Sequence, residues 1–250
     1  MSDFYLTLPS NSSMDVYPNN TMANFKTRLP NRIELEGRWE VGLVEIQYPH
    51  TWYNLQDGEG ELAIFTPPPD ANEIVTHIPS GYYSSVNELI GRMETEIMLA
   101  MGETEYKPIT FTYDEITRKI TAHARELQLW FGETIQRILG FRIYAISDGV
   151  TEGEHVVDMD PLHSMYVYCD LLEPRVVGDK MTQLLRVIPV EGRNGDMVTR
   201  IYENVHYVPL QRKSFEVLEI DIRDSVGEKV PFERGTLNVT LHFRRRRRII

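Results

Sequence analysis

The chain has 250 residues and a formal net charge of −11 at pH 7, with 42% hydrophobic and 25% charged residues. These proportions are typical of a globular protein and argue against a chain that is disordered throughout. No apolar run reaches the length of about 18 residues that a membrane-spanning helix needs. The acidic balance argues against nucleic-acid binding over the whole surface. A chain of this length makes one large β domain or two small ones.

A β pattern dominates the first third of the chain. Between residues 33 and 43, apolar side chains at odd positions alternate with charged ones at even positions. This alternation predicts a strand with one buried and one solvent-facing side. Gly37 falls on the apolar side, where it marks a turn or bend, and the apolar phase shifts after Leu43, which predicts a β-bulge or burial of both faces. Further strands are predicted at residues 62–66 and 74–78.

The middle of the chain changes to a helical pattern. Ser85 is followed three residues later by Glu88, the spacing of a capping box, and the helix is expected to end near Gly102. Apolar residues at spacings of three and four form its stripe: Val86, Leu89, Ile90, Met93 and Ile97. The pattern after this helix predicts a hairpin at residues 109–113 and 119–124 and a strand at 127–131. A short helix at 134–139 and an exposed loop at 143–161 are predicted next.

Strand patterns return in the last third of the chain, at residues 165–171, 184–190, 198–207, 215–222 and 237–243. The fold class predicted from this order is mainly all-β: a single jelly-roll antiparallel β-sandwich with an inserted helix–hairpin–helix α+β block. The sandwich is expected to comprise residues 1–80 and 160–243, and the insertion residues 81–159. The insertion looks too small to bury a core of its own. Residues 244–250 form a basic C-terminal tail.

No catalytic residue, metal ligand or cofactor site is predicted. The seven histidines are at least eight residues apart, and neither a metallopeptidase helix motif nor a phosphate-binding glycine loop is present. Asp158 and Asp160 are interpreted as solvated surface in preference to a cation site. The single cysteine, Cys169, cannot form an internal disulfide and is predicted to be a small buried hydrophobic residue.

The strongest candidate site is a run of five arginines at the end of the chain: Arg244, Arg245, Arg246, Arg247 and Arg248. Removing these five positive charges from the total of −11 leaves −16 on the rest of the chain. The run follows directly on a predicted strand, so a folded acidic body holds one cationic end. It could bind nucleic acid, direct nuclear import, dock on acidic neighbouring subunits, or only aid solubility.

A second candidate set consists of aromatic residues before the insertion and at its start: Trp52, Tyr53, Tyr82 and Tyr83. Aromatic side chains bury a large area and serve as anchors in interfaces, but sheets also favour them for structural reasons. These four are candidates for an interface or receptor contact. They support an alternative function, a jelly-roll binding module of the lectin or receptor-binding kind.

Short motifs occur along nearly the whole chain in the order and spacing of a known family. They are Phe4-Tyr5-Leu6-Thr7-Leu8-Pro9-Ser10-Asn11, Tyr17-Pro18-Asn19-Asn20, Trp39-Glu40-Val41-Gly42-Leu43, Glu45-Ile46, Leu139-Gly140-Phe141, Val167-Tyr168-Cys169-Asp170, Val177-Gly178-Asp179, Leu184-Leu185-Arg186, Phe232, Gly235 and Leu241-His242-Phe243-Arg244. In these motifs the chain resembles the minor capsid (penton) proteins of Polinton (Maverick) elements and adintovirus-like viruses.

The resemblance implies a non-enzymatic structural protein of the virion. It implies a jelly roll that forms homopentamers at icosahedral vertices beside the major capsid protein, with assembly in the host nucleus or cytoplasm. The arginine run would then face packaged DNA or the underside of neighbouring capsomers, and the insertion would be open to a host receptor. No cofactor is implied.

Overall fold

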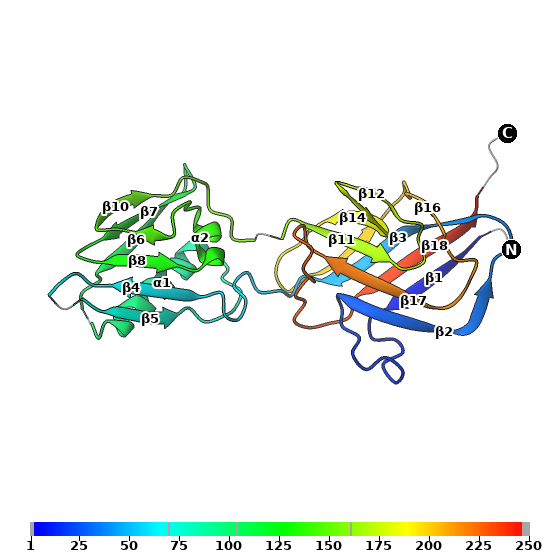
Figure 1. The fold of residues 1–250 in the computed structure, drawn as a ribbon, viewed down its shortest axis with the longest axis horizontal. Coiled ribbons are helices and arrows are strands. Elements are labelled where there is room, and N and C mark those ends of the chain that lie inside the picture. Colours follow the sequence, from blue (N-terminus) through cyan, green and yellow to red (C-terminus); the bar gives the residue numbers. More distant parts are fainter. Residues whose placement is uncertain (1–2, 70, 104, 161, 247–250) are drawn as a thin grey trace. The chain divides into compact units, whose positions relative to one another are not determined.

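The structure is a computed structural model that describes residues 3–69, 71–103, 105–160 and 162–246. The chain divides into two compact units (Figure 1). The first, here called the sandwich unit, comprises Met1–Trp52 and Leu162–Ile250, and the second, the inserted unit, comprises Tyr53–Pro161. Each unit has its own cluster of buried hydrophobic residues.

Most described strands of the sandwich unit form two antiparallel sheets. The first has the order β1-β18-β3-β15, with β16 also paired to β3. Its strands are β1 (Asp3–Pro9), β3 (Trp39–Pro49), β15 (Met197–Ile201), β16 (Val208–Pro209) and β18 (Asn238–Arg245). The second sheet has the order β14-β11-β17-β2. Its strands are β2 (Asn24–Glu34), β11 (Ser164–Cys169), β14 (Leu184–Pro189) and β17 (Ser214–Arg223). The predicted jelly-roll β-sandwich is confirmed.

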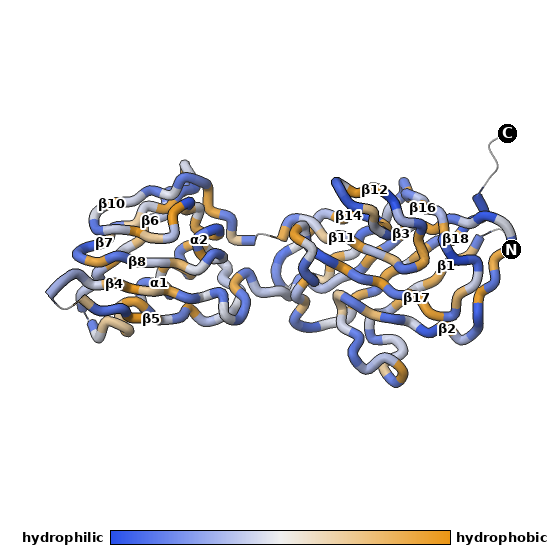
Figure 2. Tube along the Cα trace, in the orientation of Figure 1, coloured by the Kyte–Doolittle hydropathy of each residue, from blue (hydrophilic) through white to orange (hydrophobic). Residues whose placement is uncertain are grey.

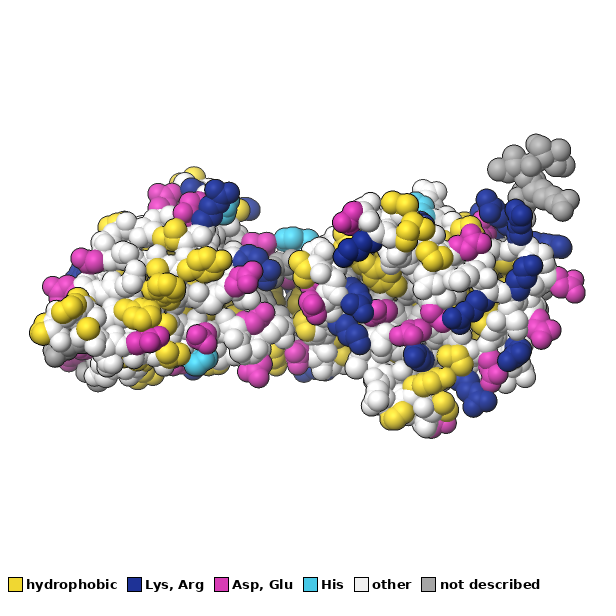
Figure 3. All heavy atoms as spheres, in the orientation of Figure 1, with side chains coloured by type: hydrophobic (Ala, Val, Ile, Leu, Met, Phe, Trp, Pro, Cys, Tyr) yellow, Lys and Arg dark blue, Asp and Glu magenta, His cyan; other side chains and the backbone are white. Residues whose placement is uncertain are grey.

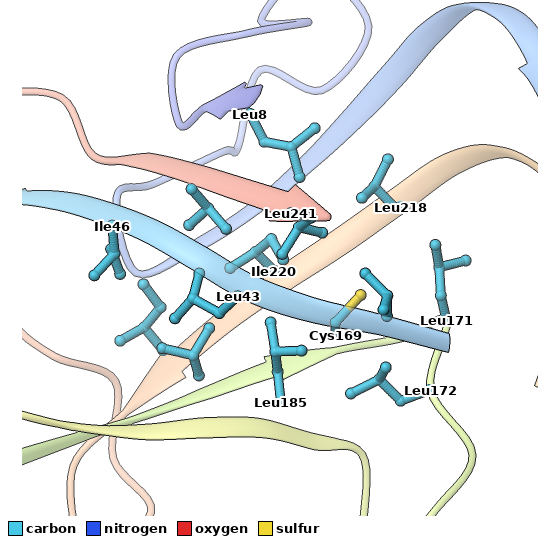
Figure 4. Packing of buried hydrophobic residues seen from close by; sticks show 14 of the residues in the cluster. Leu8, Leu43, Ile46, Cys169, Leu171, Leu172, Leu185, Leu218, Ile220 and Leu241 are labelled. Atoms are coloured by element: carbon cyan, nitrogen blue, oxygen red, sulfur yellow. The ribbon is translucent and has the colours of Figure 1, made fainter. Parts of the chain in front are cut away.

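A packed apolar core joins the two sheets. Alternating residues of strands from both sheets point into it, as Figure 4 shows for Leu43 and Leu241 from the first sheet and Leu185 and Ile220 from the second. Along the strands of both units, hydrophobic positions are interspersed with polar ones (Figure 2). Cys169 lies in this core and is 1% exposed, as the apolar run around it predicted.

The strand predicted across residues 33–43 is two strands in the structure. β2 ends at Glu34 and β3 begins at Trp39, and Gly37 between them adopts a φ of +90°. Glycine is the residue that takes this left-handed conformation without steric cost. The alternation therefore continues through a turn that passes the chain from one sheet to the other.

The predicted irregularity after Leu43 is a β-bulge. Leu43 pairs with Leu241, whereas Glu45 pairs with Thr240, so the register between β3 and β18 shifts at this point. An extra residue on one strand reverses the direction in which the following side chains point. Consequently both Leu43 and Ile46 are fully buried although they are three residues apart.

The inserted unit is larger than predicted. Its four-stranded sheet has the order β5-β4-β8-β9 and its three-stranded sheet the order β10-β7-β6. The strands are β4 (Glu61–Phe65), β5 (Glu73–His77), β6 (Ile109–Asp114), β7 (Lys119–Ala124), β8 (Gln128–Phe131), β9 (Ala145–Ile146) and β10 (Gly149–Glu152). The boundary lies at Tyr53 and not at residue 81, because β4 pairs with β8 and contributes Leu62 and Ile64 to the core of this unit.

Two helices complete the inserted unit: α1 (Val86–Ala100) and α2 (Glu133–Leu139). The predicted cap of α1 is present, since the Glu88 backbone N–H donates to Ser85 Oγ at 3.2 Å, and Glu88 Oε2 accepts from the backbone N–H of Ser84 at 2.8 Å. α2 ends at Gly140, whose φ is +78°. A Cβ atom there would lie 2.3 Å from the His155 carbonyl oxygen, so only glycine fits.

Four short strands were not predicted from the sequence. β9 and β10 lie within the predicted loop and extend the two sheets of the inserted unit. In the sandwich unit, β12 (Arg175–Val177) and β13 (Lys180–Thr182) pair with each other as an antiparallel hairpin. Both sets are short, so the alternation that reveals longer strands has too few residues to be recognised.

Two isoleucines on neighbouring strands test the position of the core. Ile46 on β3 is fully buried, whereas Ile201 on β15 is 68% exposed. We expect Ile46→Ala to lower the free energy of unfolding of the sandwich unit by about 2–5 kcal/mol, because it leaves a cavity. Ile201→Ala should cost less than about 1 kcal/mol. Amide hydrogen exchange in β18, measured in urea, gives the free energy of unfolding of both variants. Equal decreases in the two variants would contradict the position assigned to the core.

Candidate functional site

The first arginines of the run belong to the folded sheet. Arg244 and Arg245 are the last residues of β18, where Arg244 pairs with Asp3 of β1 and with Glu40 of β3. Arg246 follows directly, and its backbone N–H donates to the Arg38 carbonyl at 2.9 Å. The basic tail expected from residue 244 therefore starts inside a strand. Arg247 and Arg248 lie outside the described residues.

Arg244 is held by two contacts. Its Nε donates to Glu40 Oε1 at 2.7 Å, and its guanidinium carbon lies 3.4 Å from the centroid of the Tyr207 ring. The Tyr207 hydroxyl in turn makes a 2.7 Å hydrogen bond with His242 Nδ1. The ion pair with Glu40 and the cation–π contact with Tyr207 hold the Arg244 guanidinium against the folded unit. Arg244 is therefore less available to a partner than an arginine without such contacts.

Arg246 borders a hollow at the end of the sandwich unit, here called the basic hollow. Its volume is about 380 Å³, and it is lined by Leu35, Gly37, Arg38, Trp39, Glu173, Pro209, Leu210, Gln211, Arg212, Lys213 and Arg246. Four of these residues are cationic and only Glu173 is anionic. Loop residues on either side of Gly37 and after β16 thus extend the positive charge of β18 around a concave surface.

The cations of the basic hollow differ in how far they are neutralised. Arg212 Nη1 lies 3.3 Å from Asp170 Oδ2. Among the described residues, Arg38, Lys213 and Arg246 have no side-chain hydrogen bond or ion pair, and all three are exposed. Guanidinium groups donate in a planar fork that matches phosphate and carboxylate oxygens. The hollow is therefore suited to an anion, in a protein whose overall charge is −11.

Arg38, Arg212 and Lys213 were not predicted from the sequence. They come from two separate segments, and no run of charges marks them as the arginine run is marked. The turn at Gly37 and the strand pairing of β16 with β3 bring these segments together beside the end of β18. Only knowledge of the strand pairing could have identified the hollow.

The four candidate aromatic residues do not form one exposed surface. Trp52 is 2% exposed and packs in the sandwich core, stacked on His50 at a centroid distance of 4.0 Å. Its assignment as an interface residue is not supported, because a buried ring cannot anchor a partner. Tyr53 is 39% exposed in the inserted unit. Tyr82 and Tyr83 are half-buried there, and the Tyr83 hydroxyl donates to the Pro79 carbonyl at 2.7 Å.

Groups with reactive chemistry are sparse in the described part of the chain. It contains no cluster of three or more His, Cys, Asp and Glu side chains that could hold a metal ion. Burial raises the pKa of the Cys169 thiol to about 12. Burial also raises the pKa of Asp170, opposed by the Glu219 backbone N–H that donates to its carboxylate. No helix of the described residues is long and apolar enough to cross a membrane.

The raised pKa makes the reactivity of Cys169 a test of the core. With a pKa of about 12, roughly one thiol in ten thousand is ionised at pH 8, and the thiolate is the reactive form. We expect native protein to react with a thiol-exchange reagent at pH 8 only over hours, and denatured protein within seconds. Absorbance of the released chromophore measures both rates. Rapid reaction of the native protein would show that this part of the sandwich core is open.

Comparisons with known proteins support the fold. No family model matches the chain, and no curated protein sequence matches it. Among solved structures, the chain is similar to the mavirus penton protein, known from a crystal structure of its selenomethionine-labelled form. The TM-score is 0.54 at 9% sequence identity, and the match covers 96% of this chain and 99% of that chain. The two proteins share a fold over nearly their whole lengths, so the resemblance to penton proteins indicated by the sequence motifs is confirmed at the level of the fold.

Proposed function

We propose that the protein is a penton subunit, a minor capsid protein that forms homopentamers at the icosahedral vertices of a virion. The observation that carries the proposal is the fold shared with the mavirus penton protein, since the match includes 96% of this chain and 99% of that one. The likeness thus extends to both units and not only to the jelly roll, a fold with many functions. The sequence motifs support the same family.

A pentamer requires a surface on each subunit that differs from the surface it meets, because only such heterologous contacts close into a five-membered ring. The β12–β13 hairpin of the sandwich unit offers one side of such a contact. Val176 and Met181 are directly opposite each other in its register and are 72% and 63% exposed. Exposed apolar pairs of this kind are typical of interface cores. We assign the hairpin to the contact between neighbouring subunits.

Charge on the hairpin should prevent ring formation. We expect Val176→Glu with Met181→Glu to weaken subunit association at least about tenfold, since burying one such side chain contributes about 1.5–3 kcal/mol and 1.4 kcal/mol corresponds to tenfold. Light scattering of the purified protein, with the major capsid protein added if the ring needs it, measures the mass.

The matched control carries the same two added charges elsewhere. Val226→Glu with Ile116→Glu changes residues that are 75% and 94% exposed at turns, and it should leave association unchanged. If the hairpin variant forms a ring as stable as that of the wild-type protein, the assignment of the hairpin to the interface is wrong. A wild-type protein that stays monomeric at high concentration, with and without the major capsid protein, would contradict the pentamer itself.

The basic end of the sandwich unit is proposed to face the capsid interior and contact packaged DNA. Three described cations there, Arg38, Lys213 and Arg246, are exposed and unpaired among the described residues, and Arg247 and Arg248 add two more charges in the sequence. Contacts with phosphate carry no base specificity. This suits a protein that must hold any stretch of genome. The acidic remainder of the chain would not compete for DNA.

Salt dependence of DNA binding measures how many arginines contact phosphate. We expect the triple variant Arg246→Gln, Arg247→Gln and Arg248→Gln to bind a DNA duplex more weakly, and the slope of log K against log salt to fall in magnitude by about 2.7, or about 0.9 per lost contact. Arg244 is left in place, because it is bound to Glu40 and Tyr207. Fluorescence anisotropy over a salt series provides the measurement.

The control removes three arginines from the inserted unit: Arg125→Gln, Arg137→Gln and Arg142→Gln. All three are exposed, so the net charge changes equally while the basic end is untouched. If both triple variants have the same slope and affinity, binding depends on overall charge and the proposed site is wrong. Unchanged affinity in the first variant would also leave the arginine run without a role in DNA contact.

A further inference from the structure

One face of the inserted unit is a sheet surface with an apolar row across it. In the sheet β5-β4-β8-β9, the register aligns Val75 with Ala63, Ala63 with Trp130, and Trp130 with Ala145. The neighbours of Ala63 and Trp130 along their strands, namely Leu62, Ile64, Leu129 and Phe131, are buried in the core of the unit. Since side chains alternate between the two faces of a strand, the row points away from that core. Figure 3 shows hydrophobic side chains exposed over β8 and β4.

Trp130 is the largest exposed side chain of this row. Its side chain is 44% exposed, whereas the other two tryptophans, Trp39 and Trp52, are 7% and 2% exposed. The Phe65 ring meets it edge-on, with centroids 5.8 Å apart and an interplanar angle of 62°. This contact supports one side of the indole and leaves the rest open to solvent. The alternation of Gln128-Leu129-Trp130-Phe131 already indicates that Trp130 faces away from Leu129.

Four carboxylates share a hollow with these rings. The hollow has a volume of about 580 Å³ and is lined by Gly58, Glu59, Glu61, Ala63, Phe65, Glu73, Trp130, Phe131, Gly132, Glu133 and Thr134. None of these lining residues is a lysine or arginine. Glu61 lies 3.9 Å from His77, and Glu59 accepts a hydrogen bond from the Gln56 backbone N–H at 2.8 Å. Among the described residues, Glu73 and Glu133 have no side-chain partner.

The chemistry of this hollow specifies a cation on an apolar stem. The face of an indole ring carries negative electrostatic potential and attracts ammonium and guanidinium groups. Carboxylates around the ring strengthen the attraction, and the apolar row matches the methylene groups of a lysine or arginine side chain. A partner of opposite charge is also favoured during encounter. A neutral ligand would leave the charge of the four glutamates without a counterpart.

We propose that this face of the inserted unit binds a basic segment of a partner protein, with a lysine or arginine side chain over Trp130 and its charge between Glu73 and Glu133. The proposal does not depend on the vertex role or on DNA binding, because all its residues belong to the inserted unit. It adds a second candidate receptor contact to the predicted residues Tyr53, Tyr82 and Tyr83, which stay a prediction.

The test uses the full chain and a short blocked peptide, Gly-Leu-Arg-Leu-Arg-Gly, titrated at low salt and followed by tryptophan fluorescence. Because Trp130 is the exposed tryptophan, the signal reports on the proposed face. We expect a saturable change that weakens as salt is added. The same peptide with citrulline in place of arginine keeps the shape without the charge, and should not bind.

Two double variants locate the charge. Glu73→Gln with Glu133→Gln should weaken peptide binding roughly three- to tenfold, the range expected for two exposed charge contacts. Glu105→Gln with Glu115→Gln removes the same charge from exposed positions outside the hollow, and should leave affinity unchanged. Trp130→Ala should weaken binding further, as measured by calorimetry in place of fluorescence.

Several outcomes would overturn the proposal. Absence of saturable arginine-peptide binding at millimolar concentration would do so, as would equal binding of the citrulline peptide. Equal effects of the two glutamate variants would show that only overall charge matters. If a neutral oligosaccharide changed Trp130 fluorescence, and did so equally in the Glu73→Gln and Glu133→Gln variant, the face would be a carbohydrate site instead.

Discussion

The position of β18 in the middle of its sheet is the constraint on which the basic end depends. β18 pairs with β1 on one side and β3 on the other, and Val239, Leu241 and Phe243 point from it into the core. Burial of this stripe fixes where the strand ends, and the chain continues there as arginine without a linker. The energy that holds Arg244 and Arg245 in place is thus the hydrophobic packing between the two sheets. Their position follows from the core and not from their own charge.

The sequence predicted the features that depend on local alternation. The two-residue period around Leu43, the cap of α1 and the glycine stop after α2 all appear in the structure. Features that depend on pairing between distant segments were missed. The sequence pattern of β4 is equally compatible with a place in the sandwich and a place in the insertion. Its pairing with β8 assigns it to the inserted unit. Trp52 looked like an interface anchor because its stacking partner His50 and its neighbour Phe232 cannot be recognised as contacts from sequence.

Charge is distributed between the two units in a way that fits a protein with several partners. The sandwich unit gathers unpaired cations around Arg246, whereas the inserted unit gathers carboxylates around Trp130. In each case the charges surround a concave surface, so each hollow is suited to a partner of the opposite sign. The β12–β13 hairpin, which exposes Val176 and Met181, is a third surface. A subunit that meets copies of itself, a polyanion and a further protein requires three such separate surfaces.

Symmetry of the assembled protein tests the central claim most directly. Electron cryo-microscopy of the purified protein, alone and mixed with the major capsid protein, would show class averages of the ring. The account predicts five-fold averages in which each sandwich unit contacts its neighbours through unlike surfaces. Particles that remain single subunits under both conditions, or that close with a different symmetry, would contradict the account.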